Sequence, residues 1–212
     1  MQVISVNLGS KETVRTGDRE VETGIHKRPV ASAHAGRTGL AGDTIVSEEH
    51  HGGPDQAVYL YSTQDYAWWA KELGRDDLQP GLFGENLTVD LDGVGPLRVG
   101  DRFTIGEVVL EVTAPRMPCA KFQAVVAEPD WRKTFDAARR HGAYTRVLAE
   151  GTVEEGMAIE YLPADPSHPE IEELADIYLE PKADPARLEA ALAAPVAERA
   201  REAIERRLER RS

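Results

Sequence analysis

Cys119 is the residue best suited to nucleophilic or metal-binding chemistry, because no other cysteine occurs among the 212 residues of the chain. It lies in the segment 115–122, whose sequence is PRMPCAKF. Arg116 and Lys121 flank the sulfur, and nearby positive charge favours the thiolate, the form that attacks electrophiles or binds metals. Pro118 keeps the preceding backbone extended and excludes a mid-helix position. A lone cysteine also occurs as a small buried apolar side chain, so both interpretations stay open.

The charge around this cysteine is opposite in sign to that of the whole chain. The formal net charge of −12 argues against general nucleic-acid binding, which depends on a basic surface that releases counterions. Residues 115–147 nevertheless contain seven basic residues against three acidic ones. The seven are Arg116, Lys121, Arg132, Lys133, Arg139, Arg140 and Arg146. This local excess favours a small anionic ligand near the cysteine, the alternative being a solvated basic face far from it.

Two polar loops carry further candidate residues. His50 and His51 lead into a predicted strand, and adjacent histidines of an extended chain point to opposite sides, so only one easily faces a given ligand. Their spacing is not that of a zinc site. Hydrogen bonding or proton transfer by one histidine is the functional hypothesis, and a structural role is the alternative. The second loop, 81–88 (GLFGENLT), combines a glycine turn with the carboxylate of Glu85 and the amide of Asn86.

Short alternations of apolar residues predict a mainly β protein over the first three quarters of the chain. Gly, Asp and Pro separate these segments, which indicates turns. The predicted strands are 3–8, 57–61, 87–89, 102–105, 108–113, 144–148 and 157–162. Several short strands with few helices between them indicate a barrel or a curled sheet.

Two helices interrupt these strands. Ser62 begins a capping signal for a helix that Gly74 ends. The second helix, from about 129–140, places Trp131 and Phe135 four residues apart on one face.

After residue 162 the pattern changes from strands to helices. Residues 163–169 are rich in proline and predict a linker, and three short amphipathic helices are expected after it. A narrow apolar stripe can cover a neighbour but hardly folds alone. The expectation is therefore a β-rich domain over 1–162 and a three-helix appendage over 163–212. The basic end at Arg210 and Arg211 is interpreted as a solvated helix end, or as a contact for an electron-transfer partner.

Composition bounds the class of protein. No long uncharged apolar run occurs, which excludes a transmembrane helix, and the first residues lack the pattern of a secretory signal. A single cysteine cannot form an intrachain disulfide, which fits a reducing compartment. We therefore expect a cytoplasmic protein that binds neither membranes nor nucleic acid.

The motifs, taken in order, resemble those of MOSC domains. They are 50–53 (HHGG), 81–88 (GLFGENLT), 115–119 (PRMPC) and 142–147 (GAYTRV). The segments 24–30 and 39–43 also resemble the opening of the YiiM-like branch of this family, whose members carry a C-terminal three-helix extension. The resemblance spans nearly the whole chain.

This resemblance implies a MOSC-type β-barrel that binds the molybdenum cofactor, molybdopterin, with Cys119 as the protein ligand to the metal. A soft and readily deprotonated sulfur is compatible with that role. The phosphate of the cofactor needs cationic or N–H donors. The candidate cofactor-binding residues are Lys27, Arg116 and Arg146 for the phosphate, with His51 and Asn86 for the pterin or oxo ligands.

The resemblance also implies an oxidoreductase that removes oxygen from N-hydroxylated compounds, such as hydroxylaminopurines and amidoximes, as a detoxification. Electrons would come from a separate reductase, because the chain contains no flavin or nicotinamide fingerprint. Cys119 would act in catalysis, and His50 or His51 would supply the proton.

Three alternatives stay open: a non-catalytic carrier of the cofactor or of sulfur that uses Cys119, a cysteine hydrolase or transferase, and a binding module that uses the helical tail. A homodimer is likewise left open.

Overall fold

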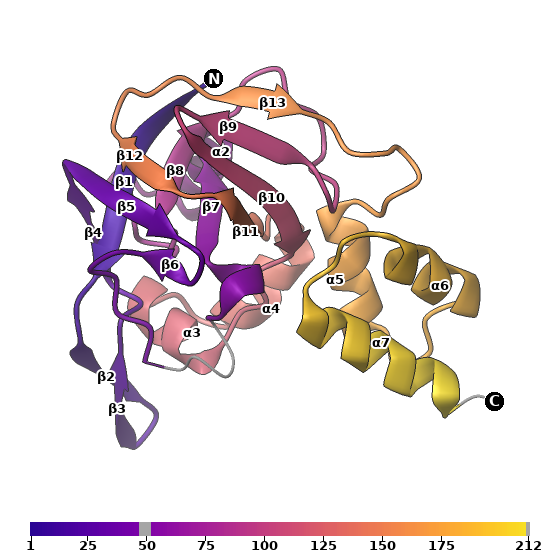
Figure 1. The fold of residues 1–212 in the computed structure, drawn as a ribbon. Coiled ribbons are helices and arrows are strands. Elements are labelled where there is room, and N and C mark those ends of the chain that lie inside the picture. The colour runs from indigo at the N-terminus through magenta and orange to yellow at the C-terminus, as the bar shows by residue number, and fades with distance from the viewer. Residues whose placement is uncertain (47–51, 211–212) are drawn as a thin grey trace.

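The computed structural model describes residues 1–46 and 52–210, and a sheet of eight strands forms its body (Figure 1). The strand order is β13-β9-β10-β11-β7-β8-β1-β4. The strands are β1 (Gln2–Gly9), β4 (Lys27–Val30), β7 (Val58–Ser62), β8 (Leu87–Asp90), β9 (Arg102–Ile105), β10 (Val108–Ala114), β11 (Ala143–Ala149) and β13 (Glu160–Leu162). All neighbours are antiparallel except β7 and β8. Such a parallel pair needs a crossover connection, which here contains a helix.

The sheet curls, but its strands do not close into a barrel with a continuous ladder. β13 and β4 stand at the two ends of the strand order. An isolated bridge joins Gln2 of β1 to Ala158, and the amide of Val3 donates to the carbonyl of Met157 at 2.9 Å. The first half of the predicted strand 157–162 therefore contacts the N-terminal strand as an irregular segment. The mainly β class is confirmed, and of the two forms expected, a barrel or a curled sheet, the structure has the curled sheet.

Two smaller sheets accompany the body. One contains β12 (Gly151–Glu154), β5 (Ser32–Gly36) and β6 (Gly39–Leu40). The other is a hairpin of β2 (Glu12–Thr16) and β3 (Arg19–Thr23), which extends away from the body (Figure 1). The sequence patterns did not predict the hairpin, because Val14 and Val21 are its only large apolar residues.

The predicted helices are present, with one addition. α2 (Thr63–Leu73) begins as expected, with the Asp65 amide donating to the Ser62 hydroxyl at 3.0 Å, and ends at Gly74 in the left-handed conformation. α4 (Trp131–Ala138) corresponds to the second predicted helix. α3 (Ala120–Val126) was not predicted. A short 3₁₀ helix, η1 (Pro54–Gln56), precedes β7.

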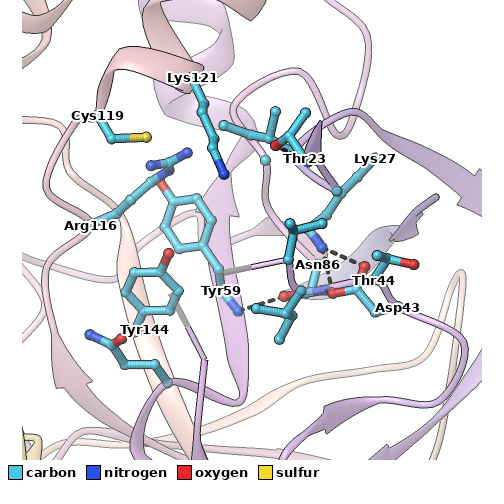
Figure 2. Close-up of a pocket in the computed structure, with 16 residues that line it drawn as sticks. Thr23, Lys27, Asp43, Thr44, Tyr59, Asn86, Arg116, Cys119, Lys121 and Tyr144 are labelled. Carbon is cyan, nitrogen blue, oxygen red and sulfur yellow. Dashed lines mark hydrogen bonds and ion pairs between the residues drawn. The ribbon is translucent and has the colours of Figure 1, made fainter. Parts of the chain in front are cut away.

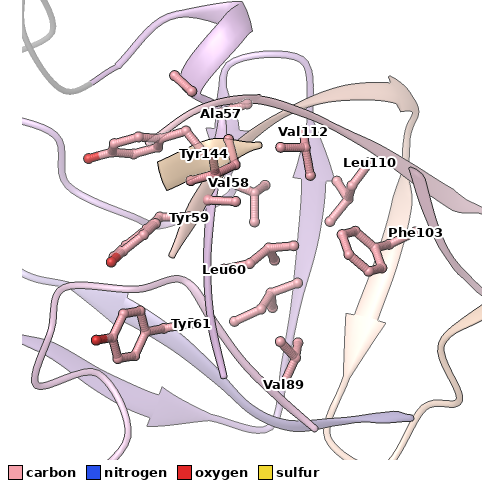
Figure 3. Close-up of a cluster of buried hydrophobic side chains, with 14 of the residues drawn as sticks. Ala57, Val58, Tyr59, Leu60, Tyr61, Val89, Phe103, Leu110, Val112 and Tyr144 are labelled. Atoms are coloured by element: carbon pink, nitrogen blue, oxygen red, sulfur yellow. The ribbon is translucent and has the colours of Figure 1, made fainter. Parts of the chain in front are cut away.

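β7 shows how one strand serves both the core and the face that carries the site. Val58 and Leu60 point into the curl of the sheet, whereas Tyr59 and Tyr61 point to the opposite side, where Tyr144 also lies (Figure 3). Side chains alternate in this way because successive residues of a strand face opposite sides. These four side chains are buried, so the position of Tyr59 is set by packing on both faces of the strand.

The three helices expected after residue 162 are confirmed as α5 (Ile171–Leu179), α6 (Pro185–Ala193) and α7 (Glu198–Glu209). They gather on one side of the sheet (Figure 1). Arg98 holds the start of α5 through Glu170, at 2.7 Å, and the amide of Ala197, just before α7, donates to the carbonyl of Thr113 in β10 at 3.2 Å. The division into two domains stays a prediction. No helix in the described ranges has the length and apolar character to cross a membrane.

Candidate functional site

A pocket lies where α3 begins, and segments far apart in the sequence line it (Figure 2). Its empty volume is about 580 Å³, including the part open to solvent, which suits a small organic ligand. At one end gather Arg116, Cys119, Lys121, Tyr59 and Tyr144, and at the other Lys27, Asp43 and Asn86 (Figure 2). The structure thus brings together four of the predicted site residues: Lys27, Asn86, Arg116 and Cys119.

Cys119 is the N-cap residue of α3. Its backbone is extended, with φ −120°, and its carbonyl accepts the hydrogen bond from the amide of Gln123 at 3.1 Å. The expectation that Pro118 keeps this cysteine out of a helix interior is therefore confirmed. The side chain is half-buried and lines the pocket, so the thiol is accessible to a ligand there. Lys121, the second residue of the helix, points into the same pocket (Figure 2).

Arg116 is a buried cation with an unused donor. The residue is 3% exposed, its guanidinium lies 4.0 Å from the ring centre of Phe122, and its Nε donates to the carbonyl of Phe83 at 3.1 Å. Burial lowers the pKa of this group, but the electrostatic effects of Tyr144, Tyr59 and Cys119 outweigh it, and the pKa lies above its ordinary value. Nη1 is buried and has no hydrogen-bond partner among the residues that the structure describes. A charged donor buried in this way is suited to an anionic acceptor.

Lys27, Asp43 and Asn86 form a hydrogen-bonded group at the other end. The ammonium of Lys27 donates to both carboxylate oxygens of Asp43, at 2.6 and 2.5 Å, and Asn86 Nδ2 donates to Asp43 Oδ2 at 2.8 Å. Burial lowers the pKa of Lys27, although Asp43 opposes this effect. Because an ammonium has three hydrogens, Lys27 keeps one for a ligand in the pocket.

Two tyrosines complete the wall nearest Cys119. The rings of Tyr59 and Tyr144 lie 5.0 Å apart, and burial raises the pKa of both phenols above the ordinary value. Both therefore stay protonated at neutral pH. Tyr59 donates its hydroxyl hydrogen to the carbonyl of His141 at 2.9 Å. The hydroxyl of Tyr144 points towards the end of the pocket where Arg116 and Cys119 lie (Figure 2).

One predicted residue, Arg146, does not join this group, and two others cannot be placed because they lie outside the described residues. Arg146 does not line the pocket, because its guanidinium is engaged elsewhere: Nε lies 3.1 Å from Asp55 Oδ1, and Nη2 donates to the carbonyls of Pro195 and Val196. Arg146 thus joins β11 to the segment before α7. His50 and His51 lie outside the described residues.

Sequence reasoning missed several lining residues. No role at the site was expected for Asp43, Tyr59 or Tyr144, and Lys121 was expected only as a positive charge beside Cys119. Their position in the sequence was the available signal. Tyr59 and Tyr144 are polar residues within short apolar segments, and Asp43 directly follows such a segment. Within residues 1–46 and 52–210, no group of three or more His, Cys, Asp or Glu side chains could hold a metal ion.

The chain is similar to known proteins in both sequence and structure. The model of the MOSC domain matches residues 47–160. Protein YflK of Bacillus subtilis, described as uncharacterised, is 37% identical over 161 residues, which are 76% of this chain and 72% of YflK. A Gibberella moniliformis protein named Reductase is 31% identical over 150 residues, 68% of this chain but 26% of that protein. The crystal structure of YiiM from Geobacillus stearothermophilus superposes with a TM-score of 0.78 at 27% identity, covering 98% of both chains, so the likeness includes α5, α6 and α7.

Proposed function

Because this chain belongs to the MOSC domain family, in its YiiM-like branch, we propose that its pocket binds the molybdenum cofactor and reduces N-hydroxylated compounds. The observation that carries the proposal is the placement of Cys119 and Arg116 together in one pocket, a half-buried thiol beside a buried cation with an unused donor. The relative named Reductase supports an oxidoreductase in general.

The residues of the pocket fit the cofactor. The sulfur of Cys119 suits a soft metal, and a single protein ligand is sufficient where the dithiolene sulfurs of the cofactor supply others. The unpartnered Nη1 of Arg116 fits an anionic group, with the remaining hydrogen of Lys27 and the ammonium of Lys121 as further donors. Arg146 is no longer part of the proposed phosphate cradle, because Asp55 and two backbone carbonyls occupy its guanidinium.

When bound, the cofactor would supply the two-electron chemistry that accepts oxygen from the substrate. The chain's own residues hold and orient the reactants. Arg116 and Lys121 place positive charge in the same pocket as the cysteine, which attracts an anionic ligand there. The protonated phenol of Tyr144 holds a proton at its hydroxyl, which faces the same end of the pocket and can donate a hydrogen bond to the oxygen of the substrate.

A separate electron-donor protein and a cytoplasmic location are part of the proposal. The donor is needed because the sequence has no fingerprint for a flavin or a nicotinamide. The location rests on the single cysteine, which fits a reducing compartment. His50 and His51 stay candidates for proton transfer.

The test is metal content and turnover of protein made in cells that synthesise the cofactor. The unaltered chain should contain one molybdenum and one pterin per protein molecule, and should reduce 6-hydroxylaminopurine or benzamidoxime with a reduced viologen as the electron donor. Cys119→Ser should lose most of the bound molybdenum and most of the turnover. Lys133→Ala, which removes a basic residue whose side chain is 85% exposed, is the matched control and should keep both.

Protein without molybdenum, or equal metal and turnover in Cys119→Ser and the unaltered chain, would contradict the proposal. Bound molybdenum without reduction of any N-hydroxylated compound would favour a cofactor carrier instead.

A further inference from the structure

Glu85 is a buried carboxyl group to which the proposed function gives no role. The residue is 0% exposed. Its Oε1 accepts three hydrogen bonds, from the Tyr66 hydroxyl at 2.7 Å, the Gly81 amide at 2.7 Å and the Thr88 hydroxyl at 2.6 Å. Its Oε2 is buried and has no hydrogen-bond partner within the described ranges. A proton bound to this carboxyl would therefore lie on Oε2, because Oε1 is already surrounded by donors.

The loop that contains Glu85 forms part of the wall of the cofactor pocket, which is the pocket that Arg116 lines. Gly84 and Asn86, the neighbours of Glu85 in the sequence, both line it. Arg116 Nε donates to the carbonyl of Phe83 at 3.1 Å, and a Cβ added to Gly84 would lie 3.2 Å from Arg116 Nη2. The buried cation of the pocket therefore lies directly against the segment that leads into Glu85.

Two cations of the cofactor pocket interact electrostatically with Glu85. Burial lowers the pKa of Lys27 in β4, and Asp43 and Glu85 oppose this effect. Burial also lowers the pKa of Arg116, and Glu85 is one of the groups that outweigh it. Glu85 interacts in addition with three buried phenols whose pKa is raised by burial, those of Tyr59 and Tyr61 in β7 and of Tyr66 in α2. Because these phenols are neutral at neutral pH, the charge of Glu85 acts mainly on Lys27 and Arg116.

The proton affinity of Glu85 depends on what the cofactor pocket holds. Burial raises the pKa of Glu85, although hydrogen bonds from Thr88, Tyr66 and Gly81 oppose this effect. An anion bound beside Arg116 would place a second negative charge near the buried carboxylate, and a like charge disfavours the ionised form. Because the coupling between two binding events is reciprocal, a proton on Glu85 strengthens anion binding by the same factor.

We infer that Glu85 regulates the cofactor pocket by taking up a proton from solvent at Oε2 when an anion binds beside Arg116. The ionised carboxylate offsets part of the positive charge of Arg116, whereas the neutral acid leaves that charge to the ligand. Anion affinity therefore rises as pH falls. The inference rests on the proposed function only in taking this pocket as the place where an anionic group binds.

Sulfate binding to protein made in cells that cannot synthesise the cofactor tests this inference. Sulfate stays a dianion between about pH 5 and pH 8, so any proton taken up on binding belongs to the protein. Calorimetry in two buffers of different ionisation enthalpy measures that uptake. The sulfate affinity of the unaltered chain should fall about ten-fold from the lower to the higher pH.

Glu85→Gln separates the charge of this residue from its role in the fold. The amide keeps the shape of the side chain and an oxygen for the three donors, but it cannot ionise. The variant should bind sulfate about ten-fold more tightly than the unaltered chain at about pH 8, and its affinity should change less with pH. Loss of a purely structural residue would weaken binding instead. Glu202→Gln in α7, which removes an equal charge from a side chain 54% exposed, is the control and should bind as the unaltered chain does.

Thr88→Val is a second variant, which serves if circular dichroism shows that Glu85→Gln does not fold. It removes one of the hydrogen bonds that lower the pKa of Glu85, so the change in sulfate affinity should move to higher pH.

The outcomes separate this inference from the proposed function. A sulfate affinity of the unaltered chain that does not depend on pH, weaker binding by folded Glu85→Gln, or no sulfate binding at all overturns the inference, whatever molybdenum the loaded protein holds. Sulfate binding that takes up a proton at Glu85, in a chain that never acquires molybdenum, supports the inference and overturns the proposed function alone.

Discussion

The side chains of Lys27 and Asp43 form an ion pair in the wall of the cofactor pocket, with Nζ 2.5 Å from Oδ2 and only 8% and 2% of the two side chains exposed. The two charges balance each other, so the positive charge offered to a ligand comes mainly from Arg116 and Lys121 at the other end. The proposed cofactor site is therefore polarised along its length.

Asp43→Asn should destabilise the protein by about 3–5 kcal/mol at neutral pH, because it leaves Lys27 as a buried cation without a counterion. Burial already lowers the pKa of Lys27, and removal of Asp43 lowers it further. At pH values between the lowered pKa of folded Lys27 and the ordinary pKa of lysine, the unfolded chain binds more protons than the folded chain. The free energy of unfolding therefore rises with pH in that window. The deficit of the variant should therefore shrink as pH rises towards the ordinary pKa of lysine. Denaturant unfolding at several pH values measures it.

Asp77→Asn is the matched control for this pair. Asp77 also accepts from a basic side chain, Arg75, but its own side chain is 67% exposed, so the loss should stay below about 1 kcal/mol. A deficit of Asp43→Asn that is the same at every pH would contradict the account of Lys27.

Arg116→Lys should reduce the molybdenum content of the purified protein while preserving the positive charge. The planar guanidinium lies against Phe122 and directs its donors in a fixed fork, whereas an ammonium is a compact charge on a flexible stem. We expect about a ten-fold weaker retention of the cofactor, measured as metal per protein after dialysis. Arg132→Lys, at an exposed position of α4, is the control. Equal retention in both variants would show that charge alone is sufficient.

Gly81→Ala should displace the backbone of Lys27, although the turn that contains Gly81 lies 54 residues further along the chain. Gly81 has φ +90°, and an added Cβ would lie 2.3 Å from the carbonyl oxygen of Lys27. Gly93 is a matched control, since it has φ +82° but no atom within 4 Å of an added Cβ. Gly93→Ala should cost about 1 kcal/mol from backbone conformation alone. Gly81→Ala should cost about 3 kcal/mol or more, and similar losses in thermal unfolding would argue against the clash.

His141→Gln should loosen α5 in a pH-dependent manner. The imidazole is 1% exposed and lies between Glu172 of α5, at 2.6 Å, and Asp136 of α4, at 3.2 Å. Burial lowers the pKa of His141, but the two carboxylates outweigh it and the pKa is raised. The stabilisation is therefore fully present below about pH 6.5 and is lost as pH rises through the raised pKa.

The variant should lose about 3 kcal/mol at about pH 6 and less at about pH 9. Amide hydrogen exchange of α5 and denaturant unfolding report the change. His34→Gln, an exposed histidine of β5 with a side chain 54% exposed, should change stability by less than about 1 kcal/mol. A loss for His141→Gln that grows with pH would refute this assignment.

Much of the fold was predictable where local chemistry decides it. Ser62 and Gly74 mark the ends of α2 correctly, because a hydroxyl cap and a left-handed glycine act within a few residues. The strand at 102–105 matches β9, since its apolar residues Phe103 and Ile105 alternate and are buried. The three C-terminal helices were predicted for the same reason.

The rest depends on contacts between distant segments. The curl brings Gln2 next to Ala158, which is 156 residues further along the chain, and no local pattern contains that pairing. α3 was missed because only seven residues separate Cys119 from Ala127 in the left-handed conformation, too few for a helical periodicity. Arg146 shows the same dependence on distant contacts at the site. Its positive charge is evident from the sequence, but its partners, the carbonyl of Pro195 before α7 and the carboxylate of Asp55, are far from it in the sequence.

The anchoring of Arg146 has a consequence for chimeric proteins. One arginine of the sheet binds both the chain entering α7 and Asp55 of η1, so the helical segment and the sheet body are attached at one point. Because the acceptors before α7 are the backbone carbonyls of Pro195 and Val196, the attachment depends on the path of the chain and not on its side chains. Chimeras joined at residue 162 should therefore tolerate other side chains at positions 195 and 196 but not an insertion there.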